Sequence, residues 1–258
     1  VLLLGASGAG KSTLLQGIAG ILGGADEGEH EGELLVDGAL AASVRGRAGM
    51  VLQDPDSQTI LARVGDDVAF GCENLGVPPA DIWPRVHAAL AAVGLDVPTD
   101  RSTANLSGGQ KQRLALAGVV AMRPGAILLD EPTANLDPEG VREVRDAVGR
   151  VLAETGATLV VIEHRVDVWL PLIDRVIVLG EAGVIADGAP ADVLDAQAAA
   201  LAEAGVWLPQ AALPLPPPPG PPGEVLLSAR ALVVGRERGV AAGPLSFDVR
   251  AGEVLGIV

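Results

Sequence analysis

The chain has 258 residues, of which 49% are apolar, and it carries a formal net charge of −15 at pH 7. This length accommodates one large α/β domain with a buried core and a little more. The acidic balance argues against a nucleic-acid partner, whose phosphates require basic side chains. The single cysteine, Cys72, excludes an internal disulfide, and no apolar run reaches the roughly 18 to 20 residues that a membrane span needs.

Short apolar runs of β type alternate with helical patterns along the first 200 residues. The predicted strands are Val1–Leu4, Gly49–Leu52, Ala126–Leu129, Thr158–Ile162 and Arg175–Leu179. A helix is expected from Lys11, and two more with apolar stripes over 81–93 and 140–154. Strands that alternate with helices predict an α/β fold with a parallel sheet core.

The first motif is Gly5–Ser12, GASGAGKS, between a predicted strand and a predicted helix. It fits the phosphate loop G-x-x-x-x-G-K-[ST], in which backbone N–H groups surround a phosphate, the lysine reaches the β and γ phosphates, and the serine binds Mg²⁺. An ordinary glycine-rich turn is the alternative, and the strand–loop–helix context disfavours it. The predicted ATP-binding residues are Gly5, Ala6, Ser7, Gly8, Ala9, Gly10, Lys11, Ser12 and Thr13.

Residues 106–113, LSGGQKQR, predict a loop that leads into a helix capped by Ser107. The backbone of Gly108 and Gly109 and the Ser107 hydroxyl form a possible second anion site. One bound nucleotide does not need two such sites, so the pattern suggests a nucleotide held between two chains or domains. The residues assigned to this motif are Leu106, Ser107, Gly108, Gly109 and Gln110.

The strand-like run 126–132, AILLDEP, ends in two adjacent carboxylates. At the carboxyl end of a parallel strand, Asp130 is placed to hold Mg²⁺, and Glu131 to orient or deprotonate an attacking water. Alone, this pair is a weak signal that a helix cap would also explain. Together with the phosphate loop it indicates hydrolysis of a nucleoside triphosphate.

The combination of GASGAGKS, LSGGQ and AILLDEP resembles the ATP-binding cassette (ABC) family, whose members hydrolyse ATP with Mg²⁺ at the interface of two cassettes. The resemblance covers nearly all of residues 1–195. It implies a P-loop NTPase fold with a helical signature subdomain. It also implies that LSGGQ serves the nucleotide of a second cassette.

The same resemblance implies roles for three further residues. Gln53 matches the glutamine loop, which contacts Mg²⁺ or the lytic water and couples the ATPase to a membrane partner. Asp137, in TANLD, matches the loop that communicates across the dimer. His164 matches the switch histidine, which contacts the γ-phosphate. Catalytic roles are thus expected for Gln53, Glu131 and His164, and Mg²⁺ ligation for Ser12, Gln53 and Asp130.

A narrower resemblance lies in residues 51–76, VLQDPDSQTILARVGDDVAFGCENLG, which is similar to the ATPases of energy-coupling-factor importers. This resemblance implies import of a vitamin or a metal ion. The implied partners are a second cassette, a transmembrane scaffold and a substrate-binding membrane subunit. It implies a peripheral location on the cytoplasmic face of the cell membrane.

A proline-rich run, LPLPPPPGPPG, predicts a stiff linker over residues 213–223. The predicted domains are therefore an ABC ATPase domain over 1–212 that lacks its N-terminal strands, the linker, and residues 224–258. The last segment is expected to be a β-rich C-terminal tail that opens a second cassette and stops before that cassette's phosphate loop.

Two other functions remain open. The chain could be a soluble tandem ABC protein that acts on ribosomes, although its acidity and the lack of a basic helical interdomain segment disfavour contact with RNA. It could also be a catalytically inactive ATP-binding module, because strands expected before the phosphate loop are missing.

Overall fold

The computed structural model describes residues 1–22, 32–180, 183–204, 206, 223–235, 242–253 and 255. The chain divides into two compact units, Val1–Ala211 and Ala212–Val258. Of the predicted proline-rich linker, all but Gly223 lies outside the described residues.

The first unit is built on a six-stranded sheet with the strand order β4-β5-β6-β1-β7-β8. These strands are β1 (Leu2–Gly5), β4 (Ala48–Val51), β5 (Ala126–Asp130), β6 (Thr158–Ile162), β7 (Val176–Gly180) and β8 (Gly183–Gly188). The pairs from β4 to β7 are parallel, so the predicted parallel core is confirmed. The edge strand β8 pairs antiparallel with β7 and was not predicted.

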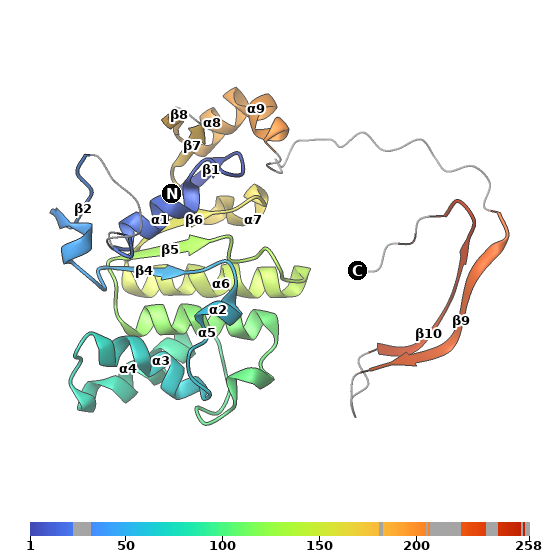
Figure 1. The fold of residues 1–258 in the computed structure, drawn as a ribbon, viewed down its shortest axis with the longest axis horizontal. Helices are drawn as coiled ribbons and strands as arrows, with labels where there is room; N and C mark the ends of the chain where they lie inside the picture. Colours follow the sequence, from blue (N-terminus) through green and yellow to red (C-terminus); the bar gives the residue numbers. More distant parts are fainter. Residues whose placement is uncertain are drawn as a thin grey trace. The chain divides into compact units, whose positions relative to one another are not determined.

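Helices cover both faces of this sheet (Figure 1). On one face, α1 (Lys11–Ile18) packs through Leu15 on Leu3 and Leu128. On the other face, α5 (Gly108–Ala121) and α6 (Pro138–Thr155) belong to the cluster that contains Leu2 and Leu129. Because alternate strand residues point to opposite faces, one apolar strand supplies both cores.

The two predicted amphipathic helices are present. In α6 the valines of the stripe are buried, and in α4 (Pro79–Ala92) the predicted apolar residues are buried as well. Both helices begin slightly earlier than predicted, at prolines, because the fixed φ of proline suits the first helical position. The buried stripe residues are Val141, Val144, Val148, Val151, Ile82, Val86, Leu90 and Val93.

The predicted helical subdomain consists of α3 (Val64–Asn74), α4 and α5, which pack on one another below the sheet in Figure 1. A short helix, α2 (Pro55–Gln58), links β4 to this subdomain. The remaining elements of the first unit are β2 (Leu35–Val36), β3 (Ala39–Leu40), η1 (Ala41–Ser43), η2 (Thr103–Asn105), α7 (Val166–Trp169), η3 (Leu170–Leu172), α8 (Pro190–Ala196) and α9 (Ala198–Glu203).

The second unit contains an antiparallel pair, β9 (Val225–Val234) and β10 (Ala242–Arg250). Ser228 and Arg230 on β9 are both hydrogen-bonded to Asp248 on β10. Several large apolar residues of β9 are exposed, Leu226 most of all at 73%. The β character predicted for the tail is therefore observed.

In the described part of the chain, no helix combines the length and the apolar character required to cross a membrane.

We predict that Leu128→Ala destabilises the first unit by about 2 to 5 kcal/mol, since it empties a fully buried site in a central strand. Urea unfolding measures the change. The matched control is Leu35→Ala in β2, where the residue is 47% exposed; it should change stability by no more than about 0.5 kcal/mol. Equal losses in the two variants would contradict the assignment of Leu128 to the core.

Candidate functional site

The phosphate loop connects β1 to α1, as the motif predicts. Gly8 and Gly10 have φ values of 83° and 81°, a left-handed backbone that glycine adopts without strain. A Cβ on Gly5 would lie 2.3 Å from the carbonyl oxygen of Leu179, so this glycine is required by close packing on β7. No side chain caps the N-terminus of α1, which leaves its N–H groups free to bind an anion.

Lys11 lies across this loop with only 7% of its surface exposed. Its Nζ donates hydrogen bonds to the carbonyl oxygens of Gly5 (3.0 Å) and Ala6 (2.9 Å). Burial lowers the pKa of Lys11, and the nearby charges of Glu131 and Asp130 oppose that shift. The ammonium group is thus positioned beside the loop, where it can meet a phosphate.

Two of the three predicted Mg²⁺ ligands, Ser12 and Asp130, meet at the end of β5, whereas the third, Gln53, is hydrogen-bonded to Glu131. Ser12 Oγ donates a hydrogen bond of 3.1 Å to Asp130 Oδ1, and burial raises the pKa of the Asp130 carboxyl. Hard oxygen atoms of this kind suit Mg²⁺, which usually takes its other ligands from water and substrate phosphates. Among the described residues there is no cluster of three or more His, Cys, Asp or Glu side chains that would hold a metal alone.

Of the three residues predicted to be catalytic, Glu131 contacts both of the others. Glu131 Oε2 accepts a hydrogen bond of 3.1 Å from Gln53 Nε2, and Glu131 Oε1 lies 3.1 Å from His164 Nε2. These residues come from the ends of β5, β4 and β6, which are 78 and 33 residues apart in the chain. Glu131 has a φ of 45°, unusual for a residue with a side chain and typical of functional sites.

The LSGGQ segment forms a second, separate group of residues. Ser107 caps α5 and forms a capping box with Gln110: the Gln110 N–H donates to Ser107 Oγ at 3.3 Å, and the Ser107 N–H donates to Gln110 Oε1 at 3.0 Å. Ser107 and Gly108 are exposed, whereas Leu106 is buried and anchors the loop. The Ser107 cap is therefore as predicted.

Asp137 lies beside this segment rather than beside the phosphate loop. It caps α6 by accepting a hydrogen bond of 2.7 Å from the Gly140 N–H, and with Ser107 and Gly109 it lines a polar hollow of about 420 Å³. In the described structure, no hydrogen bond or ion pair joins the LSGGQ residues to the phosphate loop. The predicted site residues therefore form two separate groups, one around the phosphate loop and one around LSGGQ, and the two groups do not form a single site within the described part of this chain.

Several contacts near Gln53 were not predicted from the sequence. Gln58 closes the glutamine loop: its Oε1 accepts from the Leu52 N–H and its Nε2 donates to the Met50 carbonyl oxygen, both at 2.9 Å. Asp56, on α2, forms an ion pair with Lys111 on α5. Asp56 and Gln58 belong to the segment 51–76 on which the narrower resemblance rests, but the sequence did not predict which residues they contact.

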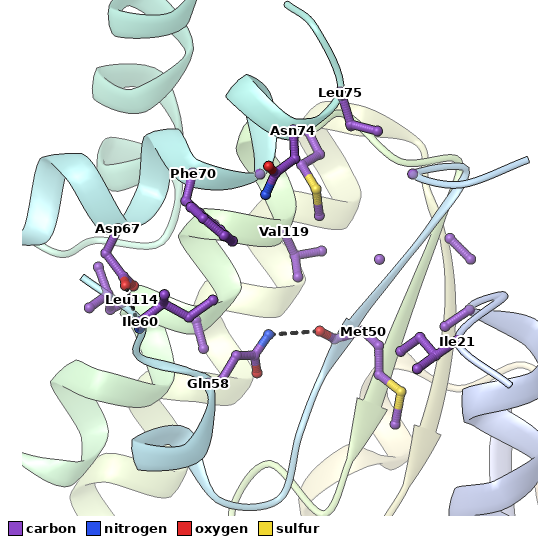
Figure 2. A pocket seen from close by; sticks show the side chains of 18 residues that line it. Ile21, Met50, Gln58, Ile60, Asp67, Phe70, Asn74, Leu75, Leu114 and Val119 are labelled. Carbon is purple, nitrogen blue, oxygen red and sulfur yellow. Dashed lines mark hydrogen bonds between the residues drawn. The ribbon is translucent and has the colours of Figure 1, made fainter. Parts of the chain in front are cut away.

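A groove of about 330 Å³ opens next to this loop (Figure 2). Phe70 and Asn74 of α3 face Val119 of α5, while Gln58 and Met50 form the side toward the sheet (Figure 2). The lining is mainly apolar. The sequence did not predict this groove, because its walls come from segments far apart in the chain.

Comparison with known proteins shows that this chain is similar to ATP-binding proteins of ABC transporters. The family model for ABC transporters matches residues 1–134. The chain is 42% identical over 219 residues to a putative ABC transporter ATP-binding protein of Methanosarcina mazei, with 81% of this chain and 36% of that protein covered. It is 47% identical over 197 residues to the energy-coupling factor transporter ATP-binding protein EcfA1 of Symbiobacterium thermophilum, with 74% and 67% covered.

A solved structure is also similar: cbiO1 of Clostridium perfringens, described as part of the ABC transporter complex cbiONQ. The TM-score is 0.66 at 37% sequence identity, with 81% of this chain and 84% of that chain covered. The chain therefore spans most of this single ATPase, but only about a third of the length of the Methanosarcina relative.

We predict that Lys11→Met weakens the binding of a nucleoside triphosphate by about ten- to a hundredfold, because a charged hydrogen-bond donor to phosphate is lost. Calorimetric titration with ATP measures the affinity. Lys111, the only other lysine, supplies the control: Lys111→Met should change the affinity by no more than about twofold. An unchanged affinity in Lys11→Met would refute the phosphate-loop assignment.

Proposed function

Because this chain belongs to the ABC transporter family, we propose that it binds and hydrolyses ATP to power an energy-coupling-factor importer. The observation that carries this proposal is the contact of Glu131 with Gln53 and His164 next to the phosphate loop.

The site residues divide the chemistry between them. The phosphate loop and Lys11 bind the triphosphate, while Ser12 and Asp130 would hold Mg²⁺, which would supply neutralisation of the phosphate charge. Glu131 orients a water and accepts its proton as that water attacks the γ-phosphate in line with the leaving oxygen. His164 and Gln53 hold the Glu131 carboxylate at its two oxygens, so that its direction is fixed before reaction.

The separation of the two groups of site residues supports a composite active site. The exposed Ser107 and Gly108 would bind the γ-phosphate of a nucleotide held by the phosphate loop of a second cassette. Asp137, next to them, would contact that cassette as well. We therefore place hydrolysis in a dimer of cassettes, in which each chain or domain supplies what the other lacks.

The second unit supports a tandem arrangement. In the proposed order of domains, the ATPase domain (1–212) and the linker (213–223) precede residues 224–258, in which β9 (Val225–Val234) and β10 (Ala242–Arg250) form an antiparallel pair, as the opening strands of a further cassette would. The Methanosarcina relative is nearly three times as long as the segment aligned with this chain, which leaves room for a second cassette. In this proposal residues 224–258 begin that cassette.

The groove in Figure 2 supports docking of a transmembrane scaffold. Its apolar lining would receive an apolar segment of that scaffold, and Gln58 connects the groove directly to the loop that carries Gln53. Such docking would place the chain peripherally at the cytoplasmic face of the cell membrane. The transported solute, a vitamin or a metal ion in this proposal, would be bound by a separate membrane subunit.

We predict that Glu131→Gln lowers the rate constant of ATP hydrolysis by about 10²- to 10⁴-fold, because the general base is lost. Binding of ATP should remain, since the phosphate loop is unchanged. Phosphate release and calorimetry measure the two quantities, and Glu154→Gln, at an exposed position of α6, is the matched control. Hydrolysis at the wild-type rate in Glu131→Gln would remove Glu131 from the role of base.

We predict that Phe70→Asp abolishes association with the membrane, because a charge enters the apolar groove. Retention of the chain by membrane vesicles from the source cells measures this. Trp83→Asp is the control, since Trp83 is 46% exposed on α4 and does not line the groove. Both variants should bind ATP as the unmodified chain does. Equal retention of Phe70→Asp and Trp83→Asp would exclude the groove as the docking site.

A further inference from the structure

Glu163 is a buried carboxylate to which the proposed mechanism gives no role. It follows the last residue of β6 and precedes His164, and only 4% of its surface is exposed. Among the described residues it takes part in no ion pair. A buried charge without a partner of opposite sign is costly, so its retention requires strong hydrogen bonds.

Among the described residues, the Glu163 carboxylate only accepts hydrogen bonds. Its Oε1 accepts from the Thr133 backbone N–H at 3.0 Å and also from the Thr133 hydroxyl. Its Oε2 accepts from the His164 backbone N–H at 3.1 Å. Thr133 is itself fully buried, with no exposed surface. The carboxylate thus joins two backbone segments that lie 30 residues apart in the chain.

Those two segments carry the groups that meet at the catalytic centre. Thr133 lies two residues after Glu131, in the turn that follows β5, and His164 is the next residue after Glu163. The Glu131 backbone is held in its left-handed conformation, with its N–H donated to the Ile162 carbonyl oxygen at 3.0 Å. The contact of 3.1 Å between Glu131 and His164 depends on the distance between these two backbone segments.

We infer that Glu163 is a positioning residue, which sets the geometry of Glu131 and His164 by tying the turn after β5 to the end of β6. This inference rests on the proposed function. Glu163 acts through its neighbours and does not contact the nucleotide. Its effect should therefore fall on the hydrolytic step and leave the phosphate loop and nucleotide affinity unchanged.

The donor pattern explains why a carboxylate is needed at this position. Glutamine has nearly the same shape, but one end of its amide is a donor. In one orientation its NH₂ group would face the His164 N–H, and in the other it would face the Thr133 N–H. One backbone donor is left unpaired in either orientation, and the two segments move apart.

The first test is imidazole NMR of the 258-residue chain, which has three histidines. In the unmodified chain, the His164 ring should be held in the tautomer that donates Nε2–H to Glu131. In Glu163→Gln we expect its nitrogen shifts to move to those of a free imidazole that averages both tautomers, while His87, exposed on α4, stays unchanged. His164 shifts identical to those of the unmodified chain would overturn the inference.

The second test is kinetic. In Glu163→Gln the rate constant of ATP hydrolysis should fall by about tenfold to a hundredfold, as small misplacements of catalytic groups do. The dissociation constant for ATP should change by no more than about twofold. Thr133→Ser, which keeps the hydroxyl and the backbone N–H, should retain most of the activity, whereas Thr133→Val should lose part of it.

The rate of ATP hydrolysis in the double variant Glu163→Gln, Glu131→Gln distinguishes a positioning role of Glu163 from a general loss of stability. If Glu163 acts through Glu131, adding Glu163→Gln to Glu131→Gln should slow hydrolysis by less than about threefold more, because residues that act as a unit are not additive. A full additional loss would show that Glu163 acts elsewhere. A normal rate in Glu163→Gln, with hydrolysis lost in Glu131→Gln, would overturn this inference alone. A normal rate in Glu131→Gln would overturn the proposed base itself.

Discussion

The parallel register of β1, β5 and β6 is the constraint on which the rest of the site depends. Asp130 pairs with Ile162, and Ile162 pairs with Leu3, so the three strands end at nearly the same level. The residues that follow these ends are the phosphate loop, Glu131, Glu163 and His164. Because side chains alternate between the two faces of a strand, a shift of one residue would move each side chain into the other core. The two differently packed cores therefore fix the register.

The positive potential at the phosphate loop is local, in a chain whose net charge is strongly negative. The formal net charge is −15, yet the phosphate loop presents free backbone N–H groups and a lysine with three hydrogen-bond donors. Asp130 and Glu131 lie close enough to Lys11 to affect its pKa. An acidic protein can bind a polyanion when the positive potential is concentrated at one loop and a divalent ion is bound with the ligand.

Whether a feature could be predicted from the sequence depends on how far apart in the chain the interacting residues lie. The phosphate loop, the Ser107 cap and the stripes of α4 and α6 depend on neighbours within a few residues, and they were predicted. Glu163 reads as an ordinary charge beside His164, because its partner Thr133 is 30 residues away. The ion pair of Asp56 with Lys111 and the groove next to it likewise require packing between distant segments, which no local pattern records.

The groove lies between α3, α5 and β4, whereas two of the three residues proposed for hydrolysis, Glu131 and His164, follow β5 and β6. Only the short segment from Gln53 to Gln58 belongs to both regions. Substitution of side chains on α3 such as Phe70 and Asn74 would therefore alter the groove without altering the residues at the ends of β5 and β6. In the proposed docking arrangement, substitutions in the groove would therefore change which membrane partner is bound, while the residues proposed for hydrolysis stay the same.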